Sequence, residues 1–564
     1  MDKLTRREFL RLSALTAGAT VLAACAPQAA PTTAPAPTTA PAAAPTTAAA
    51  AATVASTAVP ATYPIVKEPL TLTYWAPSAA NVMATLKSFG EMTCYKELEK
   101  KTGIHIEFQH PPTGQDAEQF NLVIASGKFP DIIERDWTNA PGGPAKYIKD
   151  GVILRLNDLI KQYAPNLNKV LTDHPDWRRM IVTDEGDIYC FPFIRSDPYL
   201  LTFAGLTLRG DWLDKLGLKT PTTMDEWHDV LVAFKTKDPN GNGKADEIPF
   251  TPWKDNSARG GFNMYGFVGA WGIGMNWFQD KGVVKYGPLE PAFKDFLKTM
   301  AQWYKEGLID PDYITTNLAQ LDAKMTGNQL GVAVLNTGSG IGKYIPLMLP
   351  KDPKFKMTPA PYPVLKAGDK PQLGQRDNVY AGQGSAAITT ANKRVPETVK
   401  MLDYAYGPEG HMLFNFGVEG LTYTMVNGYP KYTDEVMNSP QKLPMNQAMG
   451  KHVRSIFNGP FLQDKRYIEQ YAGLPEQQEA IKIWMQQSNE KHLPQITPTQ
   501  EESRKFSTIM AEVTTRYDEA FNKILQGQLP IDAWDQFAKD IKQMGIDDAI
   551  KIQQAALDRY NKRP

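Results

Sequence analysis

The stretch LTLTYW, residues 70–75, opens the run of segments that decides the fold class. Apolar and polar residues alternate in it, which is typical of a half-buried β-strand. Helix-like and strand-like segments then take turns along the chain, at residues 95–101, 104–108, 116–125 and 131–133. Because strands that are separated by helices usually pair in parallel, this order predicts an α/β fold with a largely parallel sheet.

The same order of strand and helix resumes beyond residue 205. A strand-like segment at 206–209 leads into a helix start at 210–213. The helix predicted over 224–237 carries a capping box from Thr223 to Glu226. The chain has 564 residues, more than a single hydrophobic core usually supports, so at least two lobes are expected.

The charge balance excludes partners that are held by bulk charge. The chain has 61 basic and 61 acidic residues, and 57 against 59 remain once residues 1–24 are set aside. A chain so close to neutrality has no general attraction for nucleic acid or for anionic lipid. No nucleic-acid partner is therefore expected.

The N-terminus has the pattern of an export signal, residues 1–24. Arg6 and Arg7 precede an apolar run of small residues that is too short to span a hydrocarbon core of about 30 Å. The run ends in LAAC, residues 22–25, which resembles a bacterial lipobox and predicts lipidation of Cys25. The arginine pair resembles a twin-arginine signal, and an ordinary positive segment of the general secretion route is the alternative.

Residues 25–62 predict a disordered tether behind the lipidated cysteine. Ala, Pro and Thr make up almost all of this segment, which lacks the large apolar side chains that a packed core needs. If Cys25 carries lipid, Cys94 and Cys190 are the cysteines that remain. Their spacing leaves open a disulfide and two buried free thiols.

Five phrases in the predicted folded region carry a family resemblance. They are YKELEKKTGIHIEF (95–108), ASGKFPDII (125–133), LRGDWLDKLGLKTPTTMDEW (208–227), EGLIDPD (306–312) and FGVEGLTYTMVNG (416–428). In this order they resemble extracellular solute-binding proteins (family 1) of ABC transporters, in the lipoprotein branch that contains alginate-oligosaccharide-binding proteins. The resemblance runs from about residue 70 to the C-terminus.

The resemblance implies an α/β, two-lobed, periplasmic-binding-protein-like fold of type II with a helical C-terminal region. Three crossings between the lobes are expected near residues 190–205, 357–364 and 414–424. The implied N-terminal lobe comprises 63–195 and 360–417, and the C-terminal lobe comprises 196–359 and 418–564. The implied function is that of a monomeric extracytoplasmic lipoprotein, which closes around an oligosaccharide and delivers it to the permease subunits of an ABC importer.

The segment DPNGNGKADE, residues 238–247, predicts a structural calcium loop. Hard oxygen ligands recur at short spacing, as Ca²⁺ requires. The candidate ligands are Asp238, Asn240, Asn242, Lys244 through its carbonyl, Asp246 and Glu247. The loop is no EF-hand, because Pro249 occupies the twelfth position, where a bidentate Glu belongs. The resemblance implies calcium here, and an Asn-Gly-rich turn is the alternative.

Candidate ligand contacts lie at predicted strand ends and crossings. They are Trp75, Tyr189, Arg209, Trp271, Arg376 and Tyr423. The aromatic rings could stack on sugar faces, and Trp253 is a further aromatic candidate. The two arginines would suit the carboxylate of an acidic sugar, or they are salt-bridged hinge residues. An acidic sugar and a neutral one both stay open, and a peptide is a further alternative.

Motifs of catalysis are missing from the sequence. The seven histidines are scattered, and HExxH, CxxC and GxSxG do not occur. Residues 336–343 resemble a phosphate loop but lack its first glycine and its Ser or Thr, and they predict a turn. Pairs such as Asp131 with Glu134 or Asp136 could serve a glycosidase, so a lipid-anchored carbohydrate hydrolase or lyase is the enzymatic alternative. The favoured hypothesis is a binding protein without catalytic activity.

Overall fold

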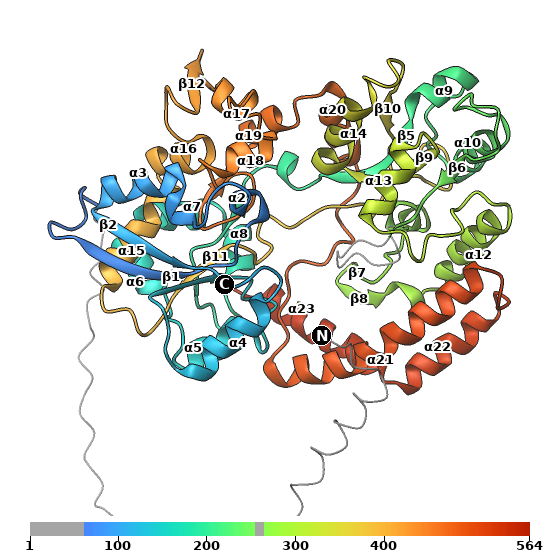
Figure 1. Cartoon of the computed structure of the whole chain (residues 1–564). Helices are drawn as coiled ribbons and strands as arrows, with labels where there is room; N and C mark the ends of the chain where they lie inside the picture. Colours follow the sequence, from blue (N-terminus) through green and yellow to red (C-terminus); the bar gives the residue numbers. More distant parts are fainter. Residues whose placement is uncertain (1–60, 254–263) are drawn as a thin grey trace, which may run out of the picture. The chain divides into compact units, whose positions relative to one another are not determined.

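The computed structural model of the chain describes residues 61–253 and 264–564. These residues belong to one compact unit, Ser56–Pro564. The expected signal segment, Cys25 and nearly all of the expected tether lie outside the described residues. Figure 1 shows the described elements coloured along the chain.

The first sheet is built from the segments that begin the sequence pattern. Its strand order is β11-β3-β1-β2, with β1 at Leu70–Trp75, β2 at Ile104–Gln109, β3 at Ile132–Arg135 and β11 at Ser385–Ile388. Strand β1 pairs in parallel with β2 and β3, and β11 runs antiparallel to β3. The expected largely parallel sheet is confirmed, because the helices α3 (Thr93–Thr102) and α4 (Asp116–Ser126) separate its first strands.

The second sheet comes from the middle of the chain. Its order is β10-β5-β9-β6, with β5 at Ala204–Arg209, β6 at Ile248–Phe250, β9 at Leu330–Asn336 and β10 at Met357–Pro359. Strands β6 and β9 are parallel, and β5 is antiparallel to both of its neighbours. Small two-stranded sheets are β4 (Ile194–Arg195) with β14 (Leu462–Gln463), β7 (Trp277–Asp280) with β8 (Val283–Tyr286), and β12 (Tyr423–Val426) with β13 (Tyr429–Tyr432).

Helices provide most of the remaining regular structure. Those before residue 200 or between 395 and 471 are α2 (Ala80–Met83), α5 (Gly143–Lys149), α6 (Asn157–Tyr163), α7 (Pro165–Asp173), α8 (Pro175–Ile181), α15 (Val395–Asp403), α16 (Pro408–Phe416), α17 (Asp434–Met437), α18 (Met445–Gly450) and α19 (Lys465–Tyr471). The others are α9 (Gly210–Leu216), α10 (Met224–Thr236), α11 (Tyr265–Val268), α12 (Pro291–Lys305), α13 (Leu318–Thr326), α14 (Gly342–Met348), α20 (Pro475–Trp484), α21 (Gln500–Leu525), α22 (Ala533–Gln543) and α23 (Ile546–Lys562).

Each of the two large sheets has its own hydrophobic core. One core contains Ile132 and Ile133 of β3 together with Phe120 of α4, all of them fully buried. The other contains Leu206 and Leu208 of β5 together with helices from both the middle and the C-terminal part of the chain. Two separate cores are what the length of the chain leads one to expect.

The crossings between these cores differ in part from the expectation. The first runs from β4 to β5, within the expected range 190–205. Residues 357–364 do not cross, because β10 pairs with β5 and Val364 still pairs with Thr223. The chain instead returns to the first sheet between Val364 and β11. There the two crossing segments are joined by backbone hydrogen bonds: the Asp377 N–H donates to the Leu201 carbonyl, and the Arg195 N–H donates to the Val379 carbonyl.

The third crossing was expected at 414–424 but lies later in the chain. The expected lobe boundaries, which depend on this crossing, shift with it. Phe414 and Phe461 both belong to the core of the first sheet. Arg454 is joined to Glu134 of β3, and β14 pairs with β4. The chain reaches the second core only at α20, where the Trp484 indole N–H donates to the Ala360 carbonyl at 3.0 Å. The passage therefore lies after Gln463.

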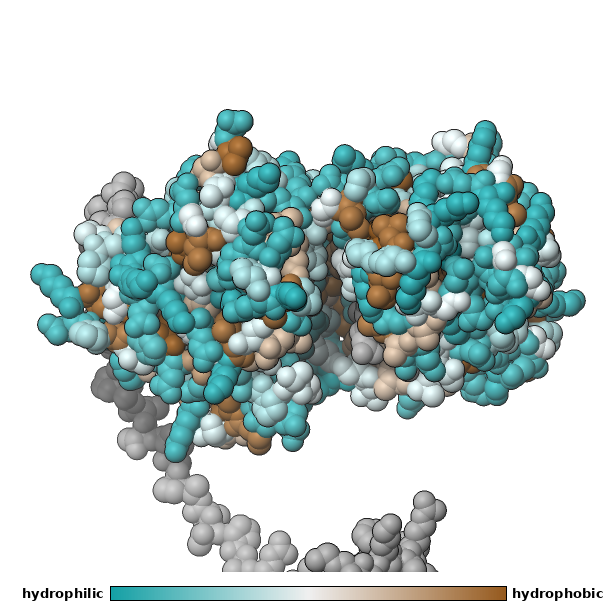
Figure 2. Space-filling view, turned by 45° about the horizontal axis from the view of Figure 1, so that its top comes forward, coloured by the Kyte–Doolittle hydropathy of each residue, from teal (hydrophilic) through white to brown (hydrophobic). Residues whose placement is uncertain are grey.

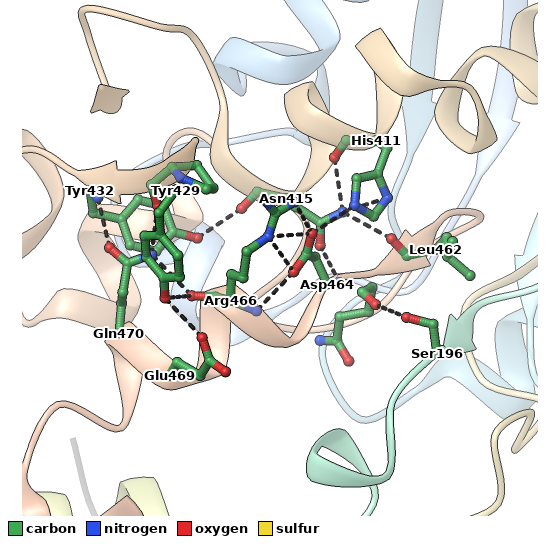
Figure 3. A network of polar contacts seen from close by, with 12 residues as sticks. Ser196, His411, Asn415, Tyr429, Tyr432, Leu462, Asp464, Arg466, Glu469 and Gln470 are labelled. Carbon is green, nitrogen blue, oxygen red and sulfur yellow. Dashed lines mark hydrogen bonds and ion pairs between the residues drawn. The ribbon is translucent and has the colours of Figure 1, made fainter. Parts of the chain in front are cut away.

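A polar network holds the start of this third passage (Figure 3). Asp464 lies 2.9 Å from Nε2 of His411 and accepts a 2.5 Å hydrogen bond from Nη2 of Arg466. Its backbone N–H donates to the Asn415 side chain at 2.9 Å. Burial would raise the pKa of Asp464, but the hydrogen bonds from His411 and Arg466 outweigh burial and hold this pKa well below its usual range.

Several local expectations are also decided by the structure. Cys94 and Cys190 are both buried free thiols, which excludes a disulfide between them in this structure. Residues 265–280 contain α11, a 3-10 turn at Gly269–Trp271 and β7. The expected turn at 336–343 is a π-helical turn, Thr337–Ile341, which continues into α14.

The surface that Figure 2 shows is mainly hydrophilic, with separate hydrophobic patches. Large apolar side chains that are exposed include Leu347, Leu349, Met425 and Val426. Among the described residues, no helix is both long enough and apolar enough to cross a membrane.

Candidate ligand-binding site

A cavity of about 540 Å³ lies at the carboxyl ends of β1 and β3. In open α/β sheets ligands bind outside the carboxyl ends of parallel strands, so the topology alone favours this place. Trp75 ends β1 and Arg135 ends β3, and both line the cavity. Neutral polar side chains from elsewhere in the chain also line it: Ser78, Asn81, Gln383 and Asn458.

The segment Gly382–Gly384 approaches the cavity so closely that only glycine fits at its ends. Gly382 and Gly384 have φ values of +84° and +65°. A Cβ at Gly382 would lie 2.4 Å from Oδ1 of Asp136, and one at Gly384 would lie 2.5 Å from the Gly459 nitrogen. Glycine tolerates both the positive φ and the close contact. The two glycines thus hold the exposed Gln383 at the cavity wall.

A buried ion pair supports the floor of the cavity. Arg454 Nη2 lies 2.5 Å from Glu134 Oε1, and the Tyr74 hydroxyl donates to the other Glu134 oxygen at 2.8 Å. Both charged side chains are almost fully buried. Burial lowers the pKa of Arg454, but the attraction of Glu134 outweighs burial and raises it. Arg454 also donates to the Asn458 carbonyl at 2.6 Å and so positions the cavity wall.

The acidic residues proposed for a glycosidase are bound to other parts of the protein. Asp131 accepts hydrogen bonds from the Thr73 N–H and hydroxyl, both at 2.8 Å. Asp136 accepts from the N–H and hydroxyl groups of Thr138 at 3.0 and 2.6 Å. Glu134 is paired with Arg454. These three carboxylates therefore have structural roles, and the geometry does not favour the enzymatic alternative.

Of the six predicted ligand contacts, the structure brings Trp75 to this cavity. The Trp75 side chain is largely buried and packs near Phe120, with ring centroids 6.2 Å apart. Trp271 and Arg376 are half-buried at other positions. Trp271 packs edge-on against Phe296 with centroids 5.4 Å apart, and burial lowers the pKa of Arg376.

The other three predicted contacts are largely buried in the structure. Arg209 is 1% exposed and binds Asp211 and Asn328, which fits the salt-bridged alternative. The buried Tyr189 hydroxyl lies 2.7 Å from the Tyr380 hydroxyl. Tyr423 packs against Phe416 in a small separate core. The sequence pattern had placed these residues near strand ends but could not show which side chains point inward.

Arg135 and Asp116 line the cavity and are absent from the sequence-based set. Arg135 follows the buried residues of β3, and Asp116 is the first residue of α4. A polar residue directly after a buried parallel strand is a signal that could have identified Arg135. Asp116 has no such signal, because only the packing of α4 brings it to the cavity.

The predicted calcium loop is a tight turn that presents oxygen atoms at close quarters. Asp238 accepts the N–H groups of Asn242 and Gly243, each at 3.1 Å. The side-chain amides of Asn240 and Asn242 donate to Asp246 at 3.0 and 2.9 Å. These bonds are also expected of the Asn-Gly turn that is the alternative to calcium.

Glu247 distinguishes the two alternatives for this loop. Its Oε1 is buried and has no hydrogen-bond partner. The pKa of Glu247 is raised, because burial and the negative charges of Asp238 and Asp246 outweigh the lowering effect of hydrogen bonds from the backbone N–H groups of Glu247 and Asn240. An unpartnered buried carboxylate oxygen beside two more acids fits a cation. No cluster of three or more His, Cys, Asp or Glu side chains in the described part of the chain is close enough to hold a metal by itself, so amide and carbonyl oxygens would have to complete the set.

The family model described as bacterial extracellular solute-binding protein matches residues 76–412, more than half of the chain. The chain belongs to this family. The resemblance seen in the sequence is thereby confirmed.

Two relatives of this solute-binding protein extend the comparison. The fructooligosaccharide ABC transporter substrate-binding protein FusA of Streptococcus pneumoniae is 28% identical over 522 residues, which cover 88% of this chain and 92% of FusA. Lipoprotein LipO of Bacillus subtilis is 28% identical over 373 residues, which cover 64% of this chain and 69% of LipO.

Solved structures confirm the two-lobed fold. The alginate-binding protein AlgQ2 without calcium ion is similar with a TM-score of 0.69 and 28% identity, and the match covers 87% of this chain and 99% of AlgQ2. An EF-hand mutant of Streptococcus pneumoniae FusA in complex with fructo-nystose is similar with a TM-score of 0.68 and 26% identity, again over 87% and 99% of the two chains.

Proposed function

We propose that this protein is the substrate-binding component of an ABC importer and that its ligand is an oligosaccharide. The observation that carries the proposal is the match, along nearly the whole of both chains, to the fructooligosaccharide ABC transporter substrate-binding protein FusA. The cavity at the strand ends supports it, because neutral polar side chains form part of its lining and sugars present many hydroxyl groups that such side chains can bind.

The two cores give this function its physical basis. A ligand that contacts both lobes binds the closed arrangement more tightly than the open one, and this difference in affinity shifts the equilibrium toward closure. The closed, ligand-bound receptor is then the form that the permease subunits recognise. The lobes act as rigid bodies because each has its own core.

Binding without turnover is the test of the proposal. The unit from Ser56 to Pro564 would be incubated with kestose, with raffinose, with a trigalacturonate and with a peptide mixture. We expect a rise in the melting temperature with an oligosaccharide and unchanged sugar afterwards. Cleaved sugar would establish the enzymatic alternative, and a shift with peptides alone would establish a peptide receptor.

We infer further that the protein is held on the extracytoplasmic face of the membrane by a lipid on Cys25 and acts there as a monomer. The lipobox-like LAAC segment at 22–25 and the similarity to a lipoprotein, LipO, support this. In cells, Cys25→Ser should move the protein from the membrane fraction to the soluble one. A variant that still sediments with membranes would contradict the anchor.

The loop 238–247 is proposed to bind Ca²⁺ in a structural role. Asp238, Asp246 and Glu247 would supply carboxylate oxygens, Asn240 and Asn242 amide oxygens, and Lys244 its carbonyl. The unpartnered Glu247 oxygen supports this assignment, as do two similar structures, one of AlgQ2 without calcium ion and one of an EF-hand mutant of FusA.

Removal of Ca²⁺ is expected to destabilise the protein. Calcium at 100 times its dissociation constant would stabilise the folded state by about 2.7 kcal/mol, and a chelator should remove this contribution. Asp238→Ala should abolish the effect of the chelator on the melting temperature. Asp229→Ala is the control, since Asp229 is exposed on the preceding helix α10. An equal response of wild type and Asp238→Ala would show that the loop is only a turn.

A further inference from the structure

Arg135 lines the cavity and has a hydrogen-bond donor that no protein group accepts. Its Nε donates to the Asp136 carbonyl at 3.2 Å, and its guanidinium carbon lies 3.6 Å from the centroid of the Phe120 ring. Nη1 is buried and has no hydrogen-bond partner. Leaving a buried charged donor unpaired is costly, so a ligand acceptor at this position would bind favourably. The stacking on Phe120 fixes the plane in which the donor lies.

Asp116 brings an unused acceptor to the same cavity. It lies four residues before Phe120 in α4, so both side chains share one face of the helix. Among the described residues, no hydrogen bond and no ion pair within 4.0 Å engages its carboxylate. Burial raises the pKa of Asp116, whereas the positive charge of Arg135 lowers it. Both side chains line the same cavity, so a single ligand there can contact both of them.

The two groups together are selective for one kind of ligand chemistry. A guanidinium only donates hydrogen bonds and a carboxylate only accepts them, whereas a hydroxyl group does both. A carboxylate on a ligand would satisfy Arg135 but would be repelled by Asp116. Arg135 is also the one basic residue among the described residues that line the cavity, beside the acids Asp116, Glu134 and Asp136.

We propose that Arg135 and Asp116 anchor two neighbouring hydroxyl groups on a neutral sugar residue of the ligand. Arg135 donates to the oxygen of one hydroxyl, and the other hydroxyl donates to Asp116. This proposal rests on the proposed function, since it names the part of the oligosaccharide that this cavity recognises. It decides between the acidic and the neutral sugar in favour of the neutral one.

Affinity measurements with two pairs of variants test the anchor. Kestose and raffinose are the neutral probes and trigalacturonate is the acidic one, titrated calorimetrically into the unit Ser56–Pro564. Arg135→Gln and Asp116→Ala are each expected to weaken binding of the neutral probe about 10- to 100-fold, the usual effect of losing a hydrogen bond to a charged group. Glu118→Ala and Lys128→Ala, at exposed positions near the same helix, should leave the affinity unchanged.

A sugar probe that lacks one hydroxyl group separates a direct contact from a structural role. A variant of a residue with only a structural role would lose the same affinity as the wild type when that hydroxyl is removed. A deoxy analogue that loses affinity for the wild type should bind Asp116→Ala or Arg135→Gln without further loss, because the partner is already gone. Melting temperatures of the variants without ligand show whether each one folds. If Arg135→Gln does not fold, Arg135→Lys, which keeps the charge, takes its place.

The outcomes separate this inference from the proposed function. If the wild type binds none of the sugars, the proposed function fails. If the wild type binds a neutral sugar and the Arg135 and Asp116 variants bind it within about twofold, the anchor is wrong while the function stands. If trigalacturonate is the sugar that binds, and Asp116→Asn binds it more tightly, Arg135 serves a carboxylate and the neutral assignment is overturned.

Discussion

Arg454→Met is expected to lower the free energy of unfolding by about 3–5 kcal/mol, because it leaves the buried charge of Glu134 without its partner. Arg454 is fully buried, and its guanidinium reaches Glu134 and the Tyr95 hydroxyl, each at 2.5 Å. It also lies 4.7 and 4.6 Å from the ring centroids of Phe89 and Phe457.

Urea-induced unfolding at neutral pH measures this loss. Arg394→Met is the matched control, because Arg394 forms a half-exposed pair with Glu397 and such pairs contribute at most about 1 kcal/mol. A loss as small as that of the control would show that Glu134 finds another partner or takes up a proton. Because Arg454 also holds the Asn458 carbonyl at the cavity wall, we expect weaker ligand binding in any Arg454 variant that folds.

Asp464→Asn is expected to cost about 2–3 kcal/mol at neutral pH, since hydrogen bonds to charged groups are among the stronger ones. Asp464 joins His411 of α16 to Arg466 of α19 at the start of the third passage between the cores. Tyr429 and Glu469 complete the neighbourhood, with a hydrogen bond of 2.9 Å between them (Figure 3). Asparagine keeps the shape of the side chain but loses the negative charge that Arg466 pairs with and that His411 contacts.

The pH dependence of this difference has a definite sign. The pKa of Asp464 is lowered in the folded state, so its contribution is present above the unfolded value of about 3.9 and is lost as the pH falls below it. The stability difference between wild type and Asp464→Asn should be constant from pH 7 to 5 and shrink below pH 4. Asp173→Asn, in an exposed helical pair with Lys169, serves as the control. A difference that does not change down to pH 3 would refute the role of the charge.

Short-range patterns identified most of the secondary structure. Residues 70–75 form a strand with the predicted limits, and helix α10 begins at the predicted residue 224 and ends at 236, one residue before its predicted end. The capping box at Thr223 and Glu226 is present as predicted, with each side chain bonded to the other's backbone. These features depend on hydrogen bonds and side-chain spacing within a few residues, and such interactions are fully specified by the local sequence.

The site could be predicted only in outline. The strand ends follow from the order of strands and helices, and this order was enough to bring Trp75 to the cavity. Arg209 has the same relation to its own strand but turns into a pocket formed by Asp211, Asn328 and the rings of Trp212 and Phe355. Which of two strand-end residues lines a cavity depends on partners that are distant in the sequence, and no local pattern contains them.

By itself, therefore, the sequence determined the α/β class, the limits of many elements, the family and the composition of the loop at 238–247. The tertiary structure decided that the chain, once it has returned to the first sheet at β11, leaves it only after Gln463. Arg454 in this part of the chain is paired with Glu134 of the first sheet, 320 positions earlier in the sequence. It also decided that Asp116 and Arg135 face one cavity. The physical reason is the same in both cases: burial makes charges seek partners, and only the folded chain determines which partner is near.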